Sequence, residues 1–300
     1  MFKSGFIALI GRPNVGKSTL MNNVLKRKVS IISPKPQTTR NQIQGIYTTD
    51  NEQIIFIDTP GIHKPHHQLG DFMNKESLST LRDVDIIVLV IDATSPFGGG
   101  DEFILNELKK VDTPVVLVVN KIDLVKDKNK LFLNILKFQE SFEFKDVYYI
   151  SAFTGEKVDE FLNELSSLLD EGPKYYDEDT ITDHPEEFII CELIREKVLM
   201  LTNEEVPHSV AVVLEEMKHN DENPDLIDIR ATIYVERQSQ KKIIIGKGGE
   251  LIKKVGTLAR KEIVMLLGQK VYLELWVKVE ENWRNKHSQL KRMGYFTEKD

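Results

Sequence analysis

The stretch GRPNVGKS occupies residues 11–18 and decides the fold of the first half of the chain. An apolar run, FIALI at 6–10, precedes it and is typical of a buried strand, and TLMNNVL at 19–25 follows with helical spacing. A strand, a turn with the pattern G-x-x-x-x-G-K-[ST] and a helix form the context that a phosphate-binding loop requires. The glycines let successive backbone N–H groups point toward phosphate oxygens, and the positive end of the helix adds to that field. The stretch therefore predicts binding of a nucleoside triphosphate, with an accidental glycine-rich turn as the weaker alternative.

The residue types in this loop have expected tasks. Lys17 reaches the β- and γ-phosphates, and the Ser18 hydroxyl ligates Mg²⁺. The residues expected to contact the nucleotide here are Gly11, Arg12, Pro13, Asn14, Val15, Gly16, Lys17, Ser18 and Thr19.

Composition limits the class of protein. The 300 residues suggest about two domains, and 41% apolar with 29% charged residues is ordinary for a soluble protein. A single cysteine, Cys191, gives neither a disulfide framework nor a metal cluster and suits a reducing cytoplasm. MFKS at 1–4 leads straight into a strand pattern, so we expect no signal peptide. Apolar runs such as 86–91 are far too short to span a bilayer.

Charge is distributed unevenly along the chain. The net charge is −7, but residues 188–300 carry 19 Lys and Arg against 18 Asp and Glu. Within residues 237–270, nine basic residues stand against two acidic ones. This local excess of positive charge in an acidic protein indicates a surface for a polyanion; the simpler interpretation is a solvated charged face.

Irregular sequence follows the phosphate-binding loop. Residues 29–44 are polar, contain two prolines and lack a clean period, so we expect a long functional loop. Apolar runs at 43–47 and 53–57 flank TDNE, which favours a hairpin. The second of these strands ends in DTPG, where Asp58 is placed to hold Mg²⁺ through water.

Residues 63–70 form a second irregular stretch, with three histidines. A metal site at His63, His66 and His67 is the less favoured interpretation. No carboxylate or cysteine joins these histidines, and solvated loop histidines are commoner.

From residue 86 onward, apolar runs alternate with amphipathic segments. Strands are expected at 86–91, 115–119 and 147–150, and helices at 101–110, 128–142 and 158–169. This alternation predicts an α/β domain with a mostly parallel sheet and helices on both faces.

Two short segments lie where such a sheet binds its ligand. NKID follows the strand at 115–119, and SAF follows the strand at 147–150. The Asp123 carboxylate can accept hydrogen bonds from N1–H and the 2-amino group of guanine, a pattern that adenine cannot supply. NKID alone is as compatible with a surface turn, but after GRPNVGKS and DTPG it predicts guanine specificity. The residues expected in this part of the nucleotide site are Asp58, Thr59, Pro60, Gly61, Asn120, Lys121, Asp123, Ser151 and Ala152.

The second half of the chain is expected to be a separate, smaller α+β domain. Residues 171–187 are acidic, contain two prolines and lack an apolar period, which predicts a linker between domains at 1–170 and 188–300. The pattern then predicts a helix at 188–201, strands at 210–214 and 227–235, a helix through 251–267, a strand at 271–277 and a basic tail helix at 282–292.

The turn GKGG at 246–249 joins two helices of this second domain. Its G-x-x-G spacing is that of the KH loop, which clamps a nucleic-acid backbone. The spacing alone is a weak signal, but the helix–strand–strand–helix–helix–strand order and the surrounding basic segment support RNA binding. The residues expected to contact RNA are Ile245, Gly246, Lys247, Gly248, Gly249, Lys253, Lys254 and Arg260.

Together, GRPNVGKS, QTTR at 37–40, DTPG, NKID and SAF resemble the motifs of Era-type GTPases, and IIIGKGGELIKKVG resembles their type II KH domain. The resemblance covers nearly the whole chain. It implies a bacterial GTPase that binds the 3′ end of small-subunit ribosomal RNA and assists maturation of the 30S subunit. It further implies partial association with the inner face of the cell membrane. We expect a monomer that uses Mg²⁺.

The resemblance also raises a question about hydrolysis. In Ras-like GTPases a Gln after the DxxG motif orients the attacking water, and Ile62 stands at that position here. In potassium-activated relatives an Asn at the position of Asn14 helps to hold K⁺ beside the phosphates; simple capping of the turn is the alternative. Either Thr38 or Thr39 is expected to ligate Mg²⁺ with Ser18.

The function predicted from these features is GTP hydrolysis that times RNA engagement. Its expected catalytic residues are Lys17, Ser18, Thr39, Gly61, whose amide senses the γ-phosphate, and Asn14. One alternative is an RNA-binding assembly chaperone in which hydrolysis is a slow reset, and another is a membrane- or cell-cycle-linked regulatory GTPase. A small-molecule P-loop kinase fits poorly, because DTPG and NKID would have no task in it.

Overall fold

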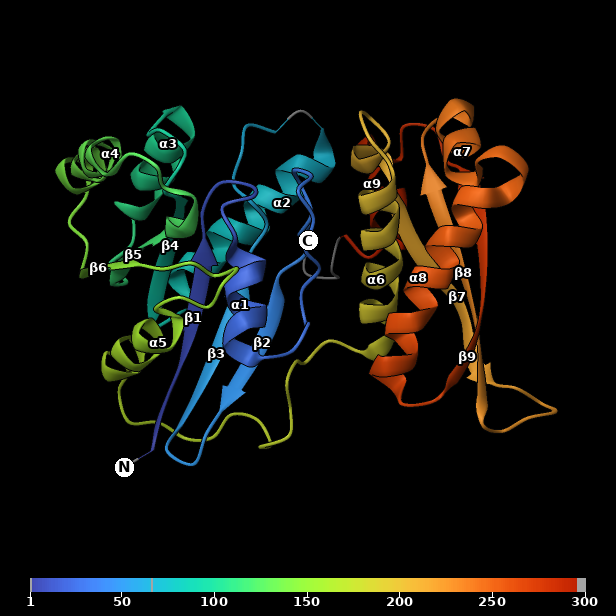
Figure 1. Ribbon diagram of the computed structural model, residues 1–300, viewed down its shortest axis with the longest axis horizontal. Coiled ribbons are helices and arrows are strands. Elements are labelled where there is room, and N and C mark those ends of the chain that lie inside the picture. Colours follow the sequence, from blue (N-terminus) through green and yellow to red (C-terminus); the bar gives the residue numbers. More distant parts are fainter. Residues whose placement is uncertain (1, 66, 296–300) are drawn as a thin grey trace. The chain divides into compact units, whose positions relative to one another are not determined.

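The computed structural model describes residues 2–65 and 67–295 and divides into two compact units (Figure 1). The first unit comprises residues up to Ser30, from Thr39 to 65 and Gly70–Asp183. The second comprises Ile31–Thr38, His67–Leu69 and the chain from His184 onward. No helix among the described residues is long and apolar enough to cross a membrane.

The first unit is built on a six-stranded sheet. Its strands are β1 (Lys3–Ile10), β2 (Ile43–Thr48), β3 (Glu52–Asp58), β4 (Ile86–Asp92), β5 (Val115–Asn120) and β6 (Asp146–Tyr149). The strand order is β2-β3-β1-β4-β5-β6. Only β2 is antiparallel to its neighbour, β3, so the hairpin and the mostly parallel sheet are both confirmed.

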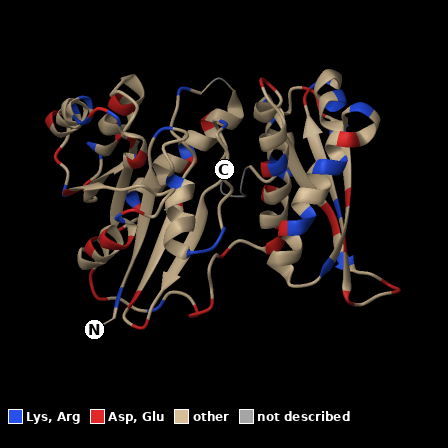
Figure 2. Ribbon diagram, in the orientation of Figure 1, with Lys and Arg blue, Asp and Glu red and all other residues tan. Residues whose placement is uncertain are grey.

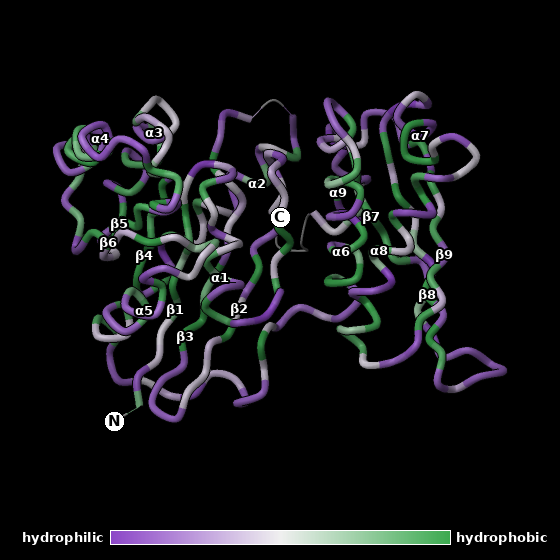
Figure 3. Tube along the Cα trace, viewed as in Figure 1, coloured by the Kyte–Doolittle hydropathy of each residue, from purple (hydrophilic) through white to green (hydrophobic). Residues whose placement is uncertain are grey.

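Helices cover this sheet because its central strands are apolar on both sides. Every residue of β5 is buried, as is nearly all of β4, and Figure 3 shows hydrophobic residues concentrated on these strands. The helices are α1 (Lys17–Leu25), α2 (Gln68–Ser79, which belongs to this unit from Gly70 onward), α3 (Gly99–Leu108), α4 (Lys128–Ser141) and α5 (Val158–Ser167), with short turns η1 (Thr80–Arg82) and η2 (Ile122–Leu124). Ile104 of α3 and Phe138 of α4 share one core with alternate strand residues, while α1 contacts β2, β3 and α5.

Helix α2 corrects one sequence-based expectation. The stretch 63–70 was expected to be irregular throughout, but α2 begins at Gln68. The reason is tertiary: Leu69, Phe72 and Met73 of this helix are almost completely buried. Their burial stabilises a helix whose start the preceding polar residues do not predict.

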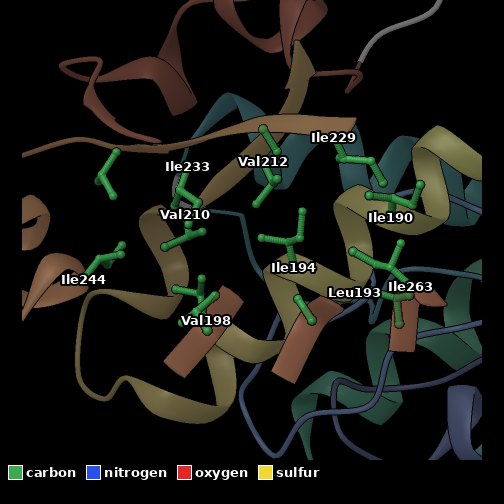
Figure 4. Packing of buried hydrophobic residues seen from close by; sticks show 14 of the residues in the cluster. Ile190, Leu193, Ile194, Val198, Val210, Val212, Ile229, Ile233, Ile244 and Ile263 are labelled. Atoms are coloured by element: carbon green, nitrogen blue, oxygen red, sulfur yellow. The ribbon is translucent and has the colours of Figure 1, made fainter. Parts of the chain in front are cut away.

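The second unit has the predicted order of elements. They are α6 (Glu186–Leu201), η3 (Pro207–Ser209), β7 (Ala211–His219), β8 (Leu226–Val235), α7 (Gln238–Ile245), η4 (Lys247–Gly249), α8 (Glu250–Leu267), β9 (Lys270–Val279), η5 (Trp283–Asn285) and α9 (His287–Arg292). In the three-stranded sheet β8 is central, antiparallel to β7 and parallel to β9. Helices α6 and α8 contribute Ile194 and Ile263 to its core, beside Ile229 and Ile233 of β8 (Figure 4).

The C-terminal segment differs from the predicted tail helix at 282–292. It forms the short turn η5 and the six-residue helix α9 instead. Trp283 causes the break, because its side chain is fully buried and its indole N–H donates to Ser209 O at 2.9 Å. Asn282 accordingly adopts a left-handed conformation.

Part of the acidic linker is held on the first unit. The side-chain oxygen of Gln53 accepts hydrogen bonds from the backbone N–H groups of Tyr175 and Tyr176, at 2.7 and 3.0 Å. Further along, Ile46 N donates to Ile181 O at 2.8 Å. Residues 175–181 therefore follow β2 and β3 through polar contacts, which explains their lack of an apolar period.

Candidate functional site

The loop between β1 and α1 has the backbone of a phosphate cradle. Gly11 (φ 152°) and Gly16 (φ 103°) both occupy positive-φ conformations. A Cβ atom would lie 2.3 Å from Val90 O at the first position and 2.2 Å from Asn120 Nδ2 at the second. Only glycine fits at either place, because the loop backbone packs directly against the ends of β4 and β5.

Lys17 lies inside this loop. Its side chain is buried, and its ammonium donates to Gly11 O at 3.2 Å and Arg12 O at 3.1 Å. Burial lowers the pKa of Lys17 to about 8, although the nearby Asp58 charge acts in the opposite direction. A phosphate group would restore the charge balance, so the loop favours an anionic ligand.

A cluster of oxygens surrounds Asp58 at the end of β3. Its Oδ2 accepts hydrogen bonds from Ser18 Oγ at 2.6 Å, Ser30 Oγ at 2.9 Å and Thr39 Oγ1 at 3.5 Å. Ser18 and Thr39 hydroxyls are 3.0 Å apart. Burial raises the pKa of Asp58, while Lys17 and the three hydroxyls lower it.

This cluster fits a hard divalent cation. Asp58 Oδ1 is buried and has no hydrogen-bond partner among the described residues. Carboxylate and hydroxyl oxygens are the ligands that Mg²⁺ prefers, and a cation would offset the cost of burying the carboxylate. Ser30 was not anticipated from the sequence, because a lone serine within a long loop carries no motif.

The structure separates the two threonines that the sequence left open. Thr39 contributes its hydroxyl to the Asp58 cluster. Thr38 does not: its hydroxyl donates to Lys35 O at 2.6 Å, within the loop itself. The arrangement therefore brings Thr39, and not Thr38, to the candidate metal site.

The DTPG segment packs directly on the phosphate-binding loop. A Cβ atom on Gly61 would lie 2.6 Å from Pro13 Cα, so only glycine allows this approach. Thr59 donates to Leu9 O at 2.8 Å and anchors the segment to β1. Ile62 is only 1% exposed and belongs to the core, so its side chain cannot orient a water.

The base end of the site is braced by Asn120 and Lys121. Asn120 donates to Val15 O and accepts from Ala152 N, both at 2.8 Å, and so joins the phosphate loop to the SAF segment. Lys121 donates to Asn14 O at 2.7 Å and pairs with Asp92 at 2.6 Å. Partial burial acts to raise the pKa of Asp92, but hydrogen bonds from Lys121 and Thr94 outweigh it and lower that pKa.

The SAF and NKID segments supply two further predicted residues. Ser151 is buried and its hydroxyl accepts from Thr154 N at 3.2 Å, which shapes the turn of the SAF segment. Asp123 is exposed within η2. The less favoured metal site at His63, His66 and His67 falls partly on His66, which lies outside the described residues; the residues that the structure describes hold no group of three His, Cys, Asp or Glu side chains that could bind a metal ion.

The turn between α7 and α8 supplies the candidate nucleic-acid surface. Gly246, Gly248 and Gly249 all have positive φ, at 74°, 61° and 82°. Space is open beyond Gly248 and Gly249, and Lys247 is exposed, so a polyanion backbone can approach closely. Figure 2 shows Lys and Arg along α7 and α8.

A groove of about 360 Å³ lies between α8 and β9. Lys253 and Arg260, both predicted to contact RNA, line it together with Ile252, Gly256, Thr257, Tyr272, Leu273 and Leu275. Tyr272 is 56% exposed and offers a ring for base stacking. Tyr272 was not among the predicted residues, although its alternation with buried Val271 and half-buried Leu273 marks it as outward-facing.

Known proteins share both units of this arrangement. A family model described as "50S ribosome-binding GTPase" matches residues 6–121, and a KH domain model matches residues 205–284. The crystal structure of Era with MgGDPNP and nucleotides 1506–1542 of 16S ribosomal RNA is 42% identical, covers 99% of this chain and 100% of its own, and has a TM-score of 0.95. The chain belongs to the Era family of GTPases.

A second member of the family agrees over the same length. A variant of Aquifex aeolicus Era bound to GDP·AlF4⁻ is also 42% identical, covers 99% of this chain and 100% of its own, and has a TM-score of 0.94. The predicted fold is confirmed: a P-loop GTPase domain followed by a KH domain. This Era-family chain is an enzyme that hydrolyses GTP.

Proposed function

We propose that the chain uses its GTPase cycle to time its hold on the 3′ end of small-subunit ribosomal RNA during 30S maturation. One observation carries this proposal: a nucleotide site and a KH surface with an open GKGG turn occur in one chain. The 42% identical Era crystallised with 16S ribosomal RNA supports the choice of RNA. A ribosomal RNA partner supports a location in the cytoplasm. Peripheral membrane association and a monomeric state are proposed from the family resemblance alone.

Residues at the nucleotide site have distinct proposed tasks. Lys17 neutralises β- and γ-phosphate charge, and the Gly61 amide, held against Pro13, senses the γ-phosphate. Ser18 and Thr39 would hold Mg²⁺ directly and Asp58 through water, and the ion would offset charge on the phosphates. Ser30 keeps the Asp58 carboxylate oriented through its 2.9 Å hydrogen bond.

Base recognition is assigned to the NKID and SAF segments. Asp123 accepts from guanine, Lys121 covers the base and the Ser151–Ala152 backbone supports it. Asn120 fixes the distance between phosphate loop and base loop through its two 2.8 Å hydrogen bonds. Asn120 thus has a proposed structural role, in addition to its predicted role in guanine selection.

Asn14 is the proposed site of potassium dependence. With Ile62 buried, no side chain at the usual position orients the attacking water. Asn14 adopts φ 64°, a conformation that asparagine tolerates better than most residues, and its carbonyl is already used by Lys121. Its side-chain oxygen is the group proposed to hold K⁺ beside the phosphates.

Coupling between nucleotide and RNA is proposed to run through the chain before Thr39. The second unit includes Ile31–Thr38, and α6 holds this segment. Arg195 donates to Thr38 O, and Ile32 N donates to Glu196 at 3.0 Å. Because Thr39 follows directly, a change at the metal cluster pulls on a segment that α6 of the KH unit binds.

Two binding measurements on the full chain test this function. RNA affinity for an oligonucleotide of the 16S 3′ end is measured with a non-hydrolysable GTP analogue and with GDP. We expect tighter binding with the analogue, by about 5–150-fold, and an equal effect of RNA on analogue affinity. Identical RNA affinities in the analogue-bound and GDP-bound states would refute the coupling, and the two units would then act independently.

The buried Ile62 also favours a second candidate, an RNA-binding assembly chaperone whose hydrolysis is only a slow reset. Single-turnover hydrolysis with and without the RNA separates the two. Strong acceleration by RNA supports the timer, and an unchanged slow rate supports the chaperone.

A further inference from the structure

A second groove lies on the first unit, away from the Asp58 cluster. It measures about 490 Å³ and is bounded by α4 and two loops, residues 93–96 after β4 and residues 124–127 at the end of η2 and beyond it. Its apolar lining includes Leu124 and Leu133, which are 57% and 60% exposed, and the adjacent Phe132 is 63% exposed. Its size is that of a ligand pocket, and large apolar side chains exposed together mark an interaction site.

The polar lining of this groove is positively charged. Lys126, Lys130 and Lys137 line it, and none of the three forms an ion pair with any described residue. The one lining carboxylate, Asp127, caps α4 by accepting from Asn129 N at 3.0 Å and Lys130 N at 3.2 Å, and the three lysines outnumber it. The groove therefore combines apolar contact area with unpaired positive charge.

Both loops of the groove continue into the nucleotide site. Ser95 N donates to Asp92 O at 3.0 Å, and Asp92 pairs with Lys121. Pro96 O accepts from the Arg12 guanidinium of the phosphate loop at 3.4 Å. On the other side, the lining begins at Leu124, immediately after the guanine-selecting residue.

Helix α4 ties these loops to the groove wall. The amide of Asn134 donates to Ser95 O at 3.0 Å, and its oxygen accepts from Phe97 N at 2.6 Å. A ligand pressed against Asn134 and Leu133 would therefore shift the loop that holds Arg12. Arg12 has a second anchor, a 3.1 Å ion pair with the buried Asp101 of α3.

We propose that this groove docks an acidic segment of a partner protein that carries large apolar side chains, and that docking changes nucleotide affinity. Charge complementarity selects a polyanionic partner. A concave surface suits a peptide better than a flat lipid layer, and the lining holds no aromatic ring on which a nucleic-acid base would stack. The change in nucleotide affinity rests on the nucleotide site assigned above; docking itself does not.

Synthetic peptides test docking on the full chain. The probes are fluorescent 12-residue peptides of Glu with one pair of Leu or Phe residues, at each spacing from adjacent to seven apart. Matched controls replace every Glu by Lys, or the apolar pair by Ser. We expect at least one acidic apolar peptide to bind with a Kd below about 100 μM, more weakly at high salt. No saturable binding, or equal binding of the Lys peptides, would overturn the proposal.

Exposed lining residues supply variants that should fold. Lys130→Glu, Lys137→Glu and Leu133→Ser are each expected to weaken the best peptide at least tenfold. Lys109→Glu, which changes an exposed lysine at the end of α3 outside the groove, should bind within twofold of wild type. Equal losses in all four, or none, would overturn the assignment of the groove.

Release of a fluorescent GDP analogue tests the regulatory part. Saturating peptide should change the release rate at least fivefold in wild type and leave the Lys130→Glu variant unaffected. An unchanged rate despite peptide binding would refute regulation. If the GDP analogue does not bind even when no peptide is present, the proposed nucleotide site is wrong. Docking of the peptide would still stand, because it is measured separately. A further outcome is that the wild-type chain binds no peptide but binds phosphatidylglycerol vesicles that the Lys130→Glu variant does not bind. That result would overturn the peptide proposal and make a lipid surface the partner of the groove.

Discussion

Replacement of Thr39 by valine tests which threonine completes the Mg²⁺ site. Valine keeps the branched shape and removes the hydroxyl, which lies 3.0 Å from Ser18 Oγ and 3.5 Å from Asp58 Oδ2. Thr38→Val is the matched control, because that hydroxyl donates to Lys35 O within its own loop. Both threonines are almost completely buried, so the two variants have similar packing consequences.

The expected magnitude follows from the task of each hydroxyl. Residues that only orient a metal ligand change metal affinity or activity by about 10–100-fold, and a direct ligand should matter at least as much. We therefore expect Thr39→Val to raise the Mg²⁺ concentration needed for half-maximal hydrolysis at least about tenfold, which is about 1.4 kcal/mol. Thr38→Val loses one neutral hydrogen bond, worth about 1 kcal/mol of folding stability, without a shift in Mg²⁺ dependence.

The assay is single-turnover GTP hydrolysis across a Mg²⁺ titration, with urea unfolding of each variant as the control for folding. A larger Mg²⁺ shift in Thr38→Val than in Thr39→Val would refute the assignment. So would equal shifts in both variants, because the loop would then act on the metal only through its overall conformation.

Base selection, the monovalent cation, the RNA contact and the lysine of the phosphate loop each give a further test. Asp123→Asn should favour xanthosine triphosphate over GTP in competition binding, because the 2-carbonyl of xanthine needs a donor; continued preference for guanine would contradict the role of Asp123. Hydrolysis should be faster in K⁺ than in Na⁺, and Asn14→Ala should remove the difference; equal wild-type rates would leave Asn14 as a cap only. Lys247→Asp should weaken RNA binding and flatten its log–log salt dependence by about 0.7 per lost phosphate contact, with GTP affinity unchanged; wild-type RNA affinity would make the turn a mere connection. Because the pKa of Lys17 is lowered to about 8, GTP binding between pH 8 and 10 should take up a proton and weaken as pH rises, which calorimetry in two buffers can measure. In the same window the unfolded chain binds more protons than the nucleotide-free fold, so stability without nucleotide should rise with pH; a Lys17→Met variant that keeps either effect would exclude this lysine as its source.

The sequence alone determined the fold class and the nucleotide chemistry. GRPNVGKS and NKID predict a phosphate-binding loop and guanine recognition from a few consecutive residues, since a strand, a tight turn and a helix start are set by local spacing. The alternation of apolar runs with amphipathic segments determined the mostly parallel sheet, and the structure confirms it. The order of elements around GKGG likewise determined the KH unit before any contact was known.

Tertiary structure decided what depends on residues far apart in the chain. Thr39 rather than Thr38 reaches Asp58, and Ser30 joins them, because the fold of the long loop sets the direction of each hydroxyl. Trp283 ended the expected tail helix by burying its ring and pairing with Ser209. Side-chain direction and burial arise only when distant segments pack together, so a local pattern cannot encode them.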